Sequence, residues 1–326
     1  MKQDLIVKSN RVRTTILFLI LSFLLSACSS LASKNMSLKF AVLPILDSLP
    51  LYVAQQEGLF EKHNLNVELV PISSGPERDQ LAAAGQIDGM INEVLTTIMS
   101  NRDNENLLVV RYARAATSEA PLFSIVASEK SGIIKPEELK GVEIAISEGT
   151  VIAYVTERIL QAEGFTIDEI ATVAVPKIPD RVSLISSGEL NAGTLPEPVS
   201  SLLAMQGASV VISDQVCPEI SHSAVTFRKS YVNENPKAVK AFLAAIEEAV
   251  LLINEDPQRW EGIMLDHNIL PPALKGKFTI PPFVTAGVPS EQQFEDVLAW
   301  AKEKQLISVD VAYAKCVSDE FLPDKP

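Results

Sequence analysis

The chain has 326 residues, about twice the length of a typical domain, so we expect one large domain or two of ordinary size. Hydrophobic residues make up 47% of it, which excludes an intrinsically disordered or fibrous protein. The 41 Asp and Glu residues outnumber the 28 Lys and Arg residues, and the net charge of -13 argues against a broad surface for nucleic acid or anionic lipid.

Cysteine and histidine usage limits the chemistry of the chain. Three cysteines are too few for a disulfide scaffold, and the three histidines stand isolated, without a metal-binding spacing. The sequence contains no P-loop, GxGxxG or GxSxG motif. We therefore expect no metal, no cofactor and no nucleic-acid partner. Spacing alone leaves open whether Cys217 and Cys316 form a disulfide or stay two buried thiols.

The N-terminus has the layout of a secretory signal peptide. Four basic residues precede an apolar run at residues 14–25, which is shorter than the roughly 20 residues of a transmembrane helix. The run ends in Leu-Ser-Ala before Cys28, and a small, polar segment follows. This arrangement resembles the bacterial lipobox, which implies cleavage before Cys28 and a lipid on that residue. The alternatives are a membrane-spanning helix and a buried Cys28.

These features predict a signal peptide at residues 1–27 and a tether at residues 28–37. The body would then be lipid-anchored in the cell envelope, on the outer face of the cytoplasmic membrane or in the periplasm.

Beyond the tether, short apolar runs alternate with amphipathic helices, which is typical of parallel sheets with crossover helices. The first series predicts a strand, a helix, a strand, a helix and a strand. The strands fall at residues 38–43, 65–71 and 86–91. The first helix falls at residues 50–57, and the second ends at residues 81–85.

The same order returns about a hundred residues later. The strands fall at residues 142–146, 171–175 and 189–195. The first helix falls at residues 150–163, and the second ends at residues 184–188. The segments LAAAGQIDG and LISSGELNA match as a helix end, a glycine stop and a strand. Because five elements recur in order, we expect an α/β protein with two similar three-layer lobes.

The last third of the chain predicts helices and no third copy. One begins at Pro236, and Ser290 with Gln293 forms a capping box ahead of another. Since the second lobe is nearly complete by Ile212, these helices are expected to return to the first lobe and enclose it. The chain is therefore expected to cross between the two lobes near residues 116–121 and near residues 221–225. The predicted lobes are residues 38–117 plus 224–326, and residues 118–223.

Two such lobes form a ligand cleft, because open α/β sheets bind ligands beyond the carboxyl ends of their strands. Ser48 and Thr150 also lie at helix starts, where backbone N–H groups can donate to a ligand. Each candidate could instead cap a helix, be solvated or, for Arg114, pair with Glu119. The candidates are Asp47, Ser48, Leu49, Asn92, Glu93, Arg114, Ser147, Glu148, Gly149, Thr150 and Glu197.

Several motifs carry a family resemblance. They are Leu43-Pro44, residues 49–54, 57–65 and 85–88, residues 148–150, Glu197-Pro198, and Trp300 ahead of Glu303-Lys304. Over residues 38–307 the chain resembles the solute-binding receptors of ABC transporters for sulfonates, taurine, nitrate and thiamine-pyrimidine precursors. The resemblance implies a type II periplasmic-binding-protein fold. It also implies a monomeric receptor that closes on its solute by hinge motion and delivers it to permease and ATPase partners.

The family also has an enzyme branch, thiamine-pyrimidine synthases that use iron, a sacrificed histidine and a cysteine-rich motif. His63 falls at a helix-to-strand turn, and the sequence has no cysteine cluster. We therefore expect a receptor and not an enzyme. A lipoprotein that senses a solute without transport, or a structural surface protein with an inactive cleft, are the remaining alternatives.

The ligand class depends on which charges face the cleft. If Asp47, Glu93, Glu148 and Glu197 line it, the carboxylates repel sulfonate or nitrate and suit an aminopyrimidine of the thiamine-precursor type. Arg114 and the two helix starts can instead hold an anion, so an alkylsulfonate or nitrate is the alternative ligand.

Overall fold

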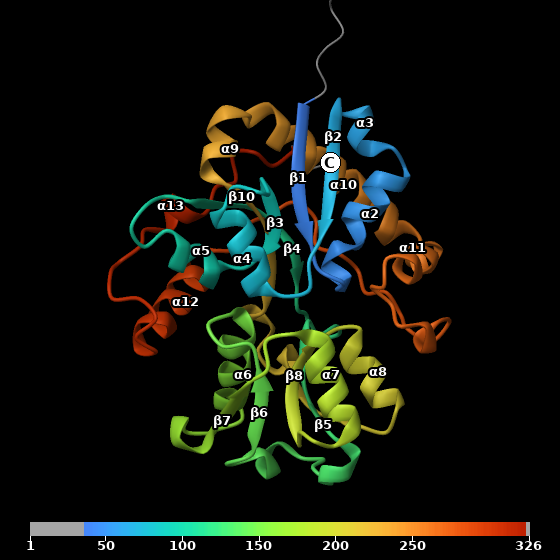
Figure 1. Cartoon of the computed structure of the whole chain (residues 1–326), viewed down its shortest axis with the longest axis vertical. Coiled ribbons are helices and arrows are strands. Elements are labelled where there is room, and N and C mark those ends of the chain that lie inside the picture. The colour runs from blue at the N-terminus through green and yellow to red at the C-terminus, as the bar shows by residue number, and fades with distance from the viewer. Residues whose placement is uncertain (1–35, 324–326) are drawn as a thin grey trace, which may run out of the picture. The chain divides into compact units, whose positions relative to one another are not determined.

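The computed structural model describes residues 36–323, and residues 37–323 belong to one compact unit. The predicted signal peptide, Cys28 and residues 28–35 of the tether lie outside the described residues. Two five-stranded sheets organise the unit (Figure 1). Among residues 36–323, no helix combines the length and the hydrophobicity that a membrane span requires.

The first sheet has the strand order β2-β1-β3-β10-β4, and the second has the order β7-β6-β8-β5-β9. The first comprises β1 (Met36–Val42), β2 (Leu65–Pro71), β3 (Gly89–Asn92), β4 (Leu107–Ala115) and β10 (His222–Arg228). The second comprises β5 (Phe123–Ala127), β6 (Glu143–Ile146), β7 (Ala171–Ala174), β8 (Ala192–Pro196) and β9 (Ser209–Ser213). The two orders correspond position by position, which confirms two similar α/β lobes. We call them the first lobe and the second lobe, each a sheet with its helices.

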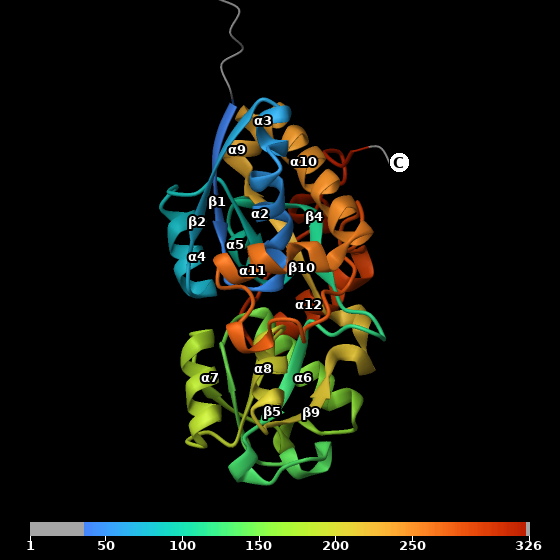
Figure 2. The ribbon, with the colours of Figure 1, turned by 90° about the vertical axis from the view of Figure 1, so that its right-hand side faces the viewer.

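Helices cover both faces of each sheet (Figure 2), with α4 opposite α10 in the first lobe and α7 opposite α6 in the second. In the first half of the chain the helices are α2 (Leu49–Gln56), α3 (Leu59–Lys62), α4 (Gly75–Ala83), α5 (Val94–Ser100) and α6 (Val151–Ala162). In the second half they are α7 (Ile178–Ser187), α8 (Val199–Met205), α9 (Lys229–Glu234), α10 (Pro236–Glu255), α11 (Glu261–Asp266), α12 (Glu291–Glu303) and α13 (Tyr313–Cys316). The lobe boundaries at residues 117–118 and 223–224 stay a prediction.

The sheets are mixed: strands of the repeated series pair in parallel, as the alternation of strands and helices predicts, and each sheet also contains an antiparallel strand. Strand β10 runs antiparallel between β3 and β4, and β5 runs antiparallel between β8 and β9. The chain leaves each lobe at the carboxyl edge of the parallel strands and therefore enters the other lobe at the matching edge. The first strand after a crossing must then run away from that edge, against its neighbours.

Helix α10 packs the first lobe as its periodicity predicts. Its positions Val239, Phe242, Leu243 and Ile253 are buried, and the Phe242 ring stacks on Phe40 with centroids 4.8 Å apart. Burial of such a stripe supplies most of the stability of a surface helix.

Helix α12 packs on the first lobe and also on the second. The capping box forms: the Ser290 hydroxyl accepts from the Gln293 N–H at 3.2 Å. The apolar stripe of α12, which includes Phe294 and Trp300, joins one core cluster with residues of α5 and of α6. Helix α12 therefore contacts both lobes, because its stripe is buried against both.

Candidate binding site

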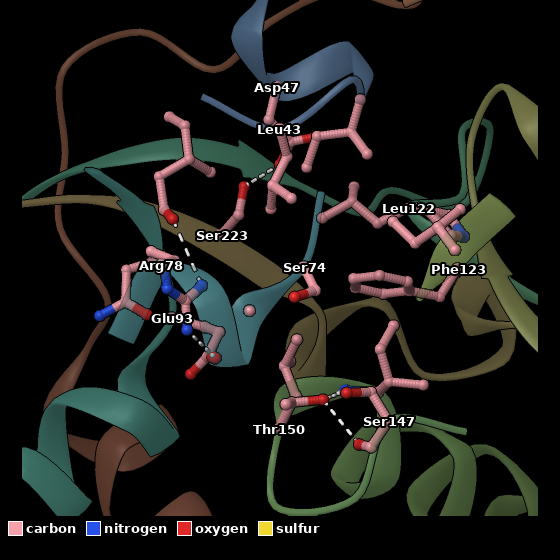
Figure 3. A pocket seen from close by; sticks show the side chains of 18 of the residues that line it. Leu43, Asp47, Ser74, Arg78, Glu93, Leu122, Phe123, Ser147, Thr150 and Ser223 are labelled. Atoms are coloured by element: carbon pink, nitrogen blue, oxygen red, sulfur yellow. Dashed lines mark hydrogen bonds and ion pairs between the residues drawn. The ribbon is translucent and has the colours of Figure 1, made fainter. Parts of the chain in front are cut away.

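A cavity of about 90 Å³ lies at the carboxyl ends of the parallel strands of both sheets. Figure 3 shows Asp47 and Ser223 on one side of it and Ser147 and Thr150 on the other. The volume is large enough for several water molecules or a small solute. Most of the wall is apolar, with leucine, isoleucine and proline side chains and the ring of Phe123. The polar lining residues are Asp47, Ser74, Arg78, Asn92, Glu93, Ser147, Thr150, Arg181 and Ser223.

Besides α5, whose N-cap Glu93 lines the cavity, three helices begin at the cavity wall. The Ser74 hydroxyl caps α4 by accepting from the Glu77 N–H at 3.3 Å, and the Thr150 hydroxyl caps α6 by accepting from the Ile152 N–H at 3.2 Å. Helix α7 begins at Ile178, which also lines the cavity. The N-terminus of a helix carries a partial positive charge, so these three helix starts favour an anionic group at the cavity wall.

Arg78 and Glu93 form a buried ion pair in the first-lobe wall. Arg78 Nη2 lies 3.3 Å from Glu93 Oε1, and Glu93 Oε2 accepts from the Thr96 N–H at 2.8 Å, which caps α5. Burial works against the Arg78 cation, but the carboxylates of Glu93 and Asp79 outweigh burial and raise its pKa. The Glu93 charge is therefore compensated within the protein.

Asp47 is the other carboxylate of the cavity. The Ser223 hydroxyl donates to Asp47 Oδ1, and Arg114 Nη1 lies 3.9 Å from Oδ2. Arg114 is buried behind Asp47, over the ring of Phe283, and burial lowers its pKa against the pull of nearby carboxylates. Arg114 thus pairs with Asp47, while Glu119 is exposed.

Arg181 of α7 brings a cation into the second-lobe wall. Only 1% of it is exposed, and its Nη1 donates to the carbonyls of Val175 at 2.7 Å and Pro176 at 3.1 Å. Within the described residues its Nε has no hydrogen-bond partner, and no carboxylate lies within ion-pair distance. Burial lowers the pKa of Arg181 to about 10, and no neighbouring charge opposes it.

Five of the predicted site residues line the cavity: Asp47, Asn92, Glu93, Ser147 and Thr150. Ser48 and Leu49 lie in the core, where the Ser48 hydroxyl donates to the Leu43 carbonyl at 2.8 Å. Ser48 ends the 3-10 turn at Leu46–Ser48 and Leu49 begins α2, and neither residue lines the cavity.

The acidic loop residues of the second lobe lie elsewhere. Glu148 is exposed, and Gly149, at φ +67°, lines a separate groove. Glu197 accepts from the hydroxyls of Ser200 at 2.5 Å and Ser201 at 2.6 Å, and it faces another groove. Neither Glu148 nor Glu197 lines the cavity, so two of the four carboxylates behind the aminopyrimidine hypothesis are absent from it.

Sequence reasoning missed several lining residues because it considered only positions directly after repeated strands. Arg78 and Arg181 lie in the first turns of helices that follow such strands, and that position is the signal that could have found them. The missed polar residues are Ser74, Arg78, Arg181 and Ser223.

Among residues 36–323, the cysteine and histidine side chains do not line the cavity. Cys217 and Cys316 are buried free thiols, and burial raises the pKa of each to about 11. His63 Nε2 lies 2.8 Å from Glu248 Oε1. In the part of the chain that the structure describes, no group of three His, Cys, Asp or Glu residues is placed to hold a metal ion.

Two α/β lobes of matching topology with a cavity between their strand ends define the periplasmic-binding-protein fold class. Residues 46–260 match the model of the NMT1/THI5-like family. This match covers more than half of the sequence, and the chain belongs to that family.

Comparison with known proteins gives relatives and structural neighbours. A putative binding protein of Brucella abortus (strain 2308) is 26% identical over 216 residues, 64% of this chain and 63% of that protein. The match therefore spans just under two thirds of the relative's length.

Solved structures share the fold at low sequence identity. The alkanesulfonate-binding protein SsuA of Xanthomonas axonopodis pv. citri, bound to MOPS, superposes with a TM-score of 0.73 at 19% identity, covering 88% of this chain and 99% of that one. The ligand-binding component of an ABC-type import system of Staphylococcus aureus, with zinc bound, gives a TM-score of 0.72 at 16% identity, covering 88% and 97%. The desulfurization enzyme DszB also matches, with a TM-score of 0.65 at 13% identity over 88% and 97%. These likenesses establish the fold, which by itself serves both binding and catalysis.

Proposed function

We propose that the chain is the solute-binding receptor of an ABC importer and captures a small molecule between its two lobes. The observation that carries the proposal is the cavity, whose wall includes Asp47 and Arg78 of the first lobe and Phe123 and Arg181 of the second. A solute that contacts both lobes at once binds the closed arrangement better than an open one and shifts the population toward closure.

The family and the relatives support this proposal. The chain belongs to the NMT1/THI5-like family, a relative is named a binding protein, and a structural neighbour is named a component of an ABC-type import system. In this proposal the receptor is a monomer, a lipid on Cys28 holds it in the cell envelope, and permease and ATPase subunits receive the solute. Sensing without transport is the alternative use of the same cavity.

The cavity wall supports binding rather than catalysis. Its described polar residues include no Cys and no His. Glu93 is held by Arg78 and by the start of α5, so its oxygens are occupied. The cavity therefore offers positioned donors and acceptors without an activated nucleophile.

The charges of the cavity favour the anion alternative over an aminopyrimidine. Glu93 is compensated by Arg78, and Asp47 is held by Ser223 and Arg114. An aminopyrimidine would need a carboxylate that is free to accept from its amino group.

Thermal unfolding with a panel of alkylsulfonates, carboxylates, nitrate and aminopyrimidines tests the receptor function. A solute at a hundredfold excess over its dissociation constant raises the unfolding free energy by about 2.7 kcal/mol. Mass spectrometry of small molecules released from the denatured protein detects a solute that co-purified. No stabilisation by any solute, together with no released molecule, would contradict the proposal.

A further inference from the structure

We infer that the solute is a small monoanion with an apolar body and that Arg181 binds its anionic group. This inference rests on the proposed receptor function and assigns the chemistry of its ligand. It depends on a cation that the protein leaves without a countercharge, on the donors around that cation, and on the apolar remainder of the wall.

Arg181 differs from the other buried arginines of this fold. Arg111 lies 2.6 Å from Glu247, Arg78 lies 3.3 Å from Glu93, and Arg114 lies 3.9 Å from Asp47. Within the described residues, Arg181 has no such partner, although it is at least as buried as Arg78. An unpaired buried cation is costly, and an anionic ligand in the adjoining cavity would supply the missing charge.

The second-lobe wall around Arg181 presents donors. The starts of α6 and α7, helices of twelve and ten residues, lie at the cavity wall, and the partial positive charge of a helix N-terminus favours an anion. Ser147 adds a hydroxyl, and no described acidic side chain of the second lobe lines the cavity. The two first-lobe carboxylates, Asp47 and Glu93, already have arginine partners. The surplus charge of the cavity is therefore one positive charge, which fits a monoanion.

The rest of the wall fits an apolar body. Leu122, Phe123, Ile152 and Ile178 line the cavity between its polar ends. The space of about 90 Å³ suits a small solute. Benzoate and butanesulfonate are small monoanions with an apolar body and serve as probes. Benzamide has the shape of benzoate without its charge.

Isothermal titration calorimetry on the purified protein tests the inference with benzoate, butanesulfonate, benzamide and an aminopyrimidine. We expect the wild type to bind an anion more tightly than benzamide. Arg181→Gln should weaken anion binding by roughly 10- to 100-fold, since a hydrogen bond to a charged group is lost. It should change benzamide binding by less than about threefold. Arg181→Lys keeps the positive charge but lacks the planar guanidinium. Its affinity for the anion should lie between those of the wild type and Arg181→Gln.

Arg102→Gln is the matched control, because it removes one positive charge from an exposed position that does not line the cavity. Circular dichroism checks that each variant is folded. Anion binding by folded Arg181→Gln at wild-type affinity overturns the role of Arg181, and preferred binding of benzamide or the aminopyrimidine overturns the anion class. Both of these results leave the receptor function standing.

If no probe binds, mass spectrometry of the small molecules released from the denatured wild type tests the inference. A released monoanion supports the inference, and a released neutral or cationic compound overturns it alone. Absence of any released compound contradicts the receptor function, and the inference falls with it.

Discussion

Trp300 of α12 donates a hydrogen bond from its indole Nε1 to Glu157 Oε1 of α6 at 3.0 Å, although the two residues lie 143 positions apart. Lys304 Nζ lies 2.6 Å from the other carboxylate oxygen, and the Trp300 ring meets the Tyr154 ring edge-on at 5.5 Å. Because α12 also packs on α5 of the first lobe, this contact ties the second lobe to the first outside the cavity.

Trp300→Phe should lower the unfolding free energy by about 1–2 kcal/mol, since it removes the donor and leaves a buried carboxylate oxygen without its partner. Urea unfolding followed by circular dichroism measures the change. Lys302→Gln is the control, because Lys302 lies on the same helix and its side chain is partly exposed. It should change the unfolding free energy by less than about 1 kcal/mol. Equal stability of Trp300→Phe and wild type would show that the hydrogen bond does not stabilise the contact.

The Arg78–Glu93 pair gives a second stability prediction. Glu93→Gln should lower the unfolding free energy by about 3–5 kcal/mol, because Arg78 then remains buried without its buried counter-ion. Asp79→Asn is the matched control, since Asp79 bonds Arg78 Nε at 2.8 Å but is more than a third exposed. It should cost less than about 1 kcal/mol. Chemical denaturation compares the two, and equal costs would contradict the buried pairing.

Gly89 begins β3 where two aromatic rings approach the backbone. A Cβ there would lie 2.7 Å from the Phe40 ring and 2.8 Å from the Phe227 ring. Gly89→Ala should therefore lower the unfolding free energy by about 1–3 kcal/mol. In contrast, Gly262→Ala in α11, where a Cβ meets no atom within 4 Å, should raise it by roughly 0.5–1 kcal/mol. Thermal unfolding of both variants should give shifts of opposite sign, and shifts of the same sign would contradict this account.

Asp214 makes stability depend on pH. It accepts from the Leu122 N–H at 3.2 Å and the Phe123 N–H at 3.0 Å at the start of β5. Burial raises its pKa from 3.8 to about 6, while these donors and Arg114 partly oppose the rise. The folded protein thus holds a proton that the unfolded chain releases. This contribution is complete below pH 3.8 and is lost as the pH rises through about 6.

Asp214→Asn removes this titration. Between pH 4 and pH 7, the unfolding free energy of the wild type should fall by up to about 3 kcal/mol relative to the variant. Urea unfolding at several pH values measures the difference, and the exposed Asp103→Asn change should leave the wild-type profile unaltered. A constant difference between wild type and Asp214→Asn across this range would contradict the raised pKa.

Local signals in the sequence determined the repeated elements. Thr150 before an apolar stripe defines the start of α6, and Gly188, at φ 76°, ends α7 where its segment predicts. Caps, glycine stops and periodicity act within a few residues, so they can be read without knowing the fold. Asn92 and Ser147 could be predicted at the cavity wall because they directly follow predicted strands, and ligands bind beyond the carboxyl ends of the strands in such sheets.

Tertiary structure alone decided the charge of the cavity and the direction of the crossing strands. Whether Asp47 carries an uncompensated charge depends on Arg114, which is distant in sequence, and whether Arg181 is paired depends on everything that packs around it. Strand β10 becomes part of the first sheet only because the chain re-enters that lobe at the cavity edge. Such relationships are set by through-space contacts between remote segments, which periodicity and spacing do not encode.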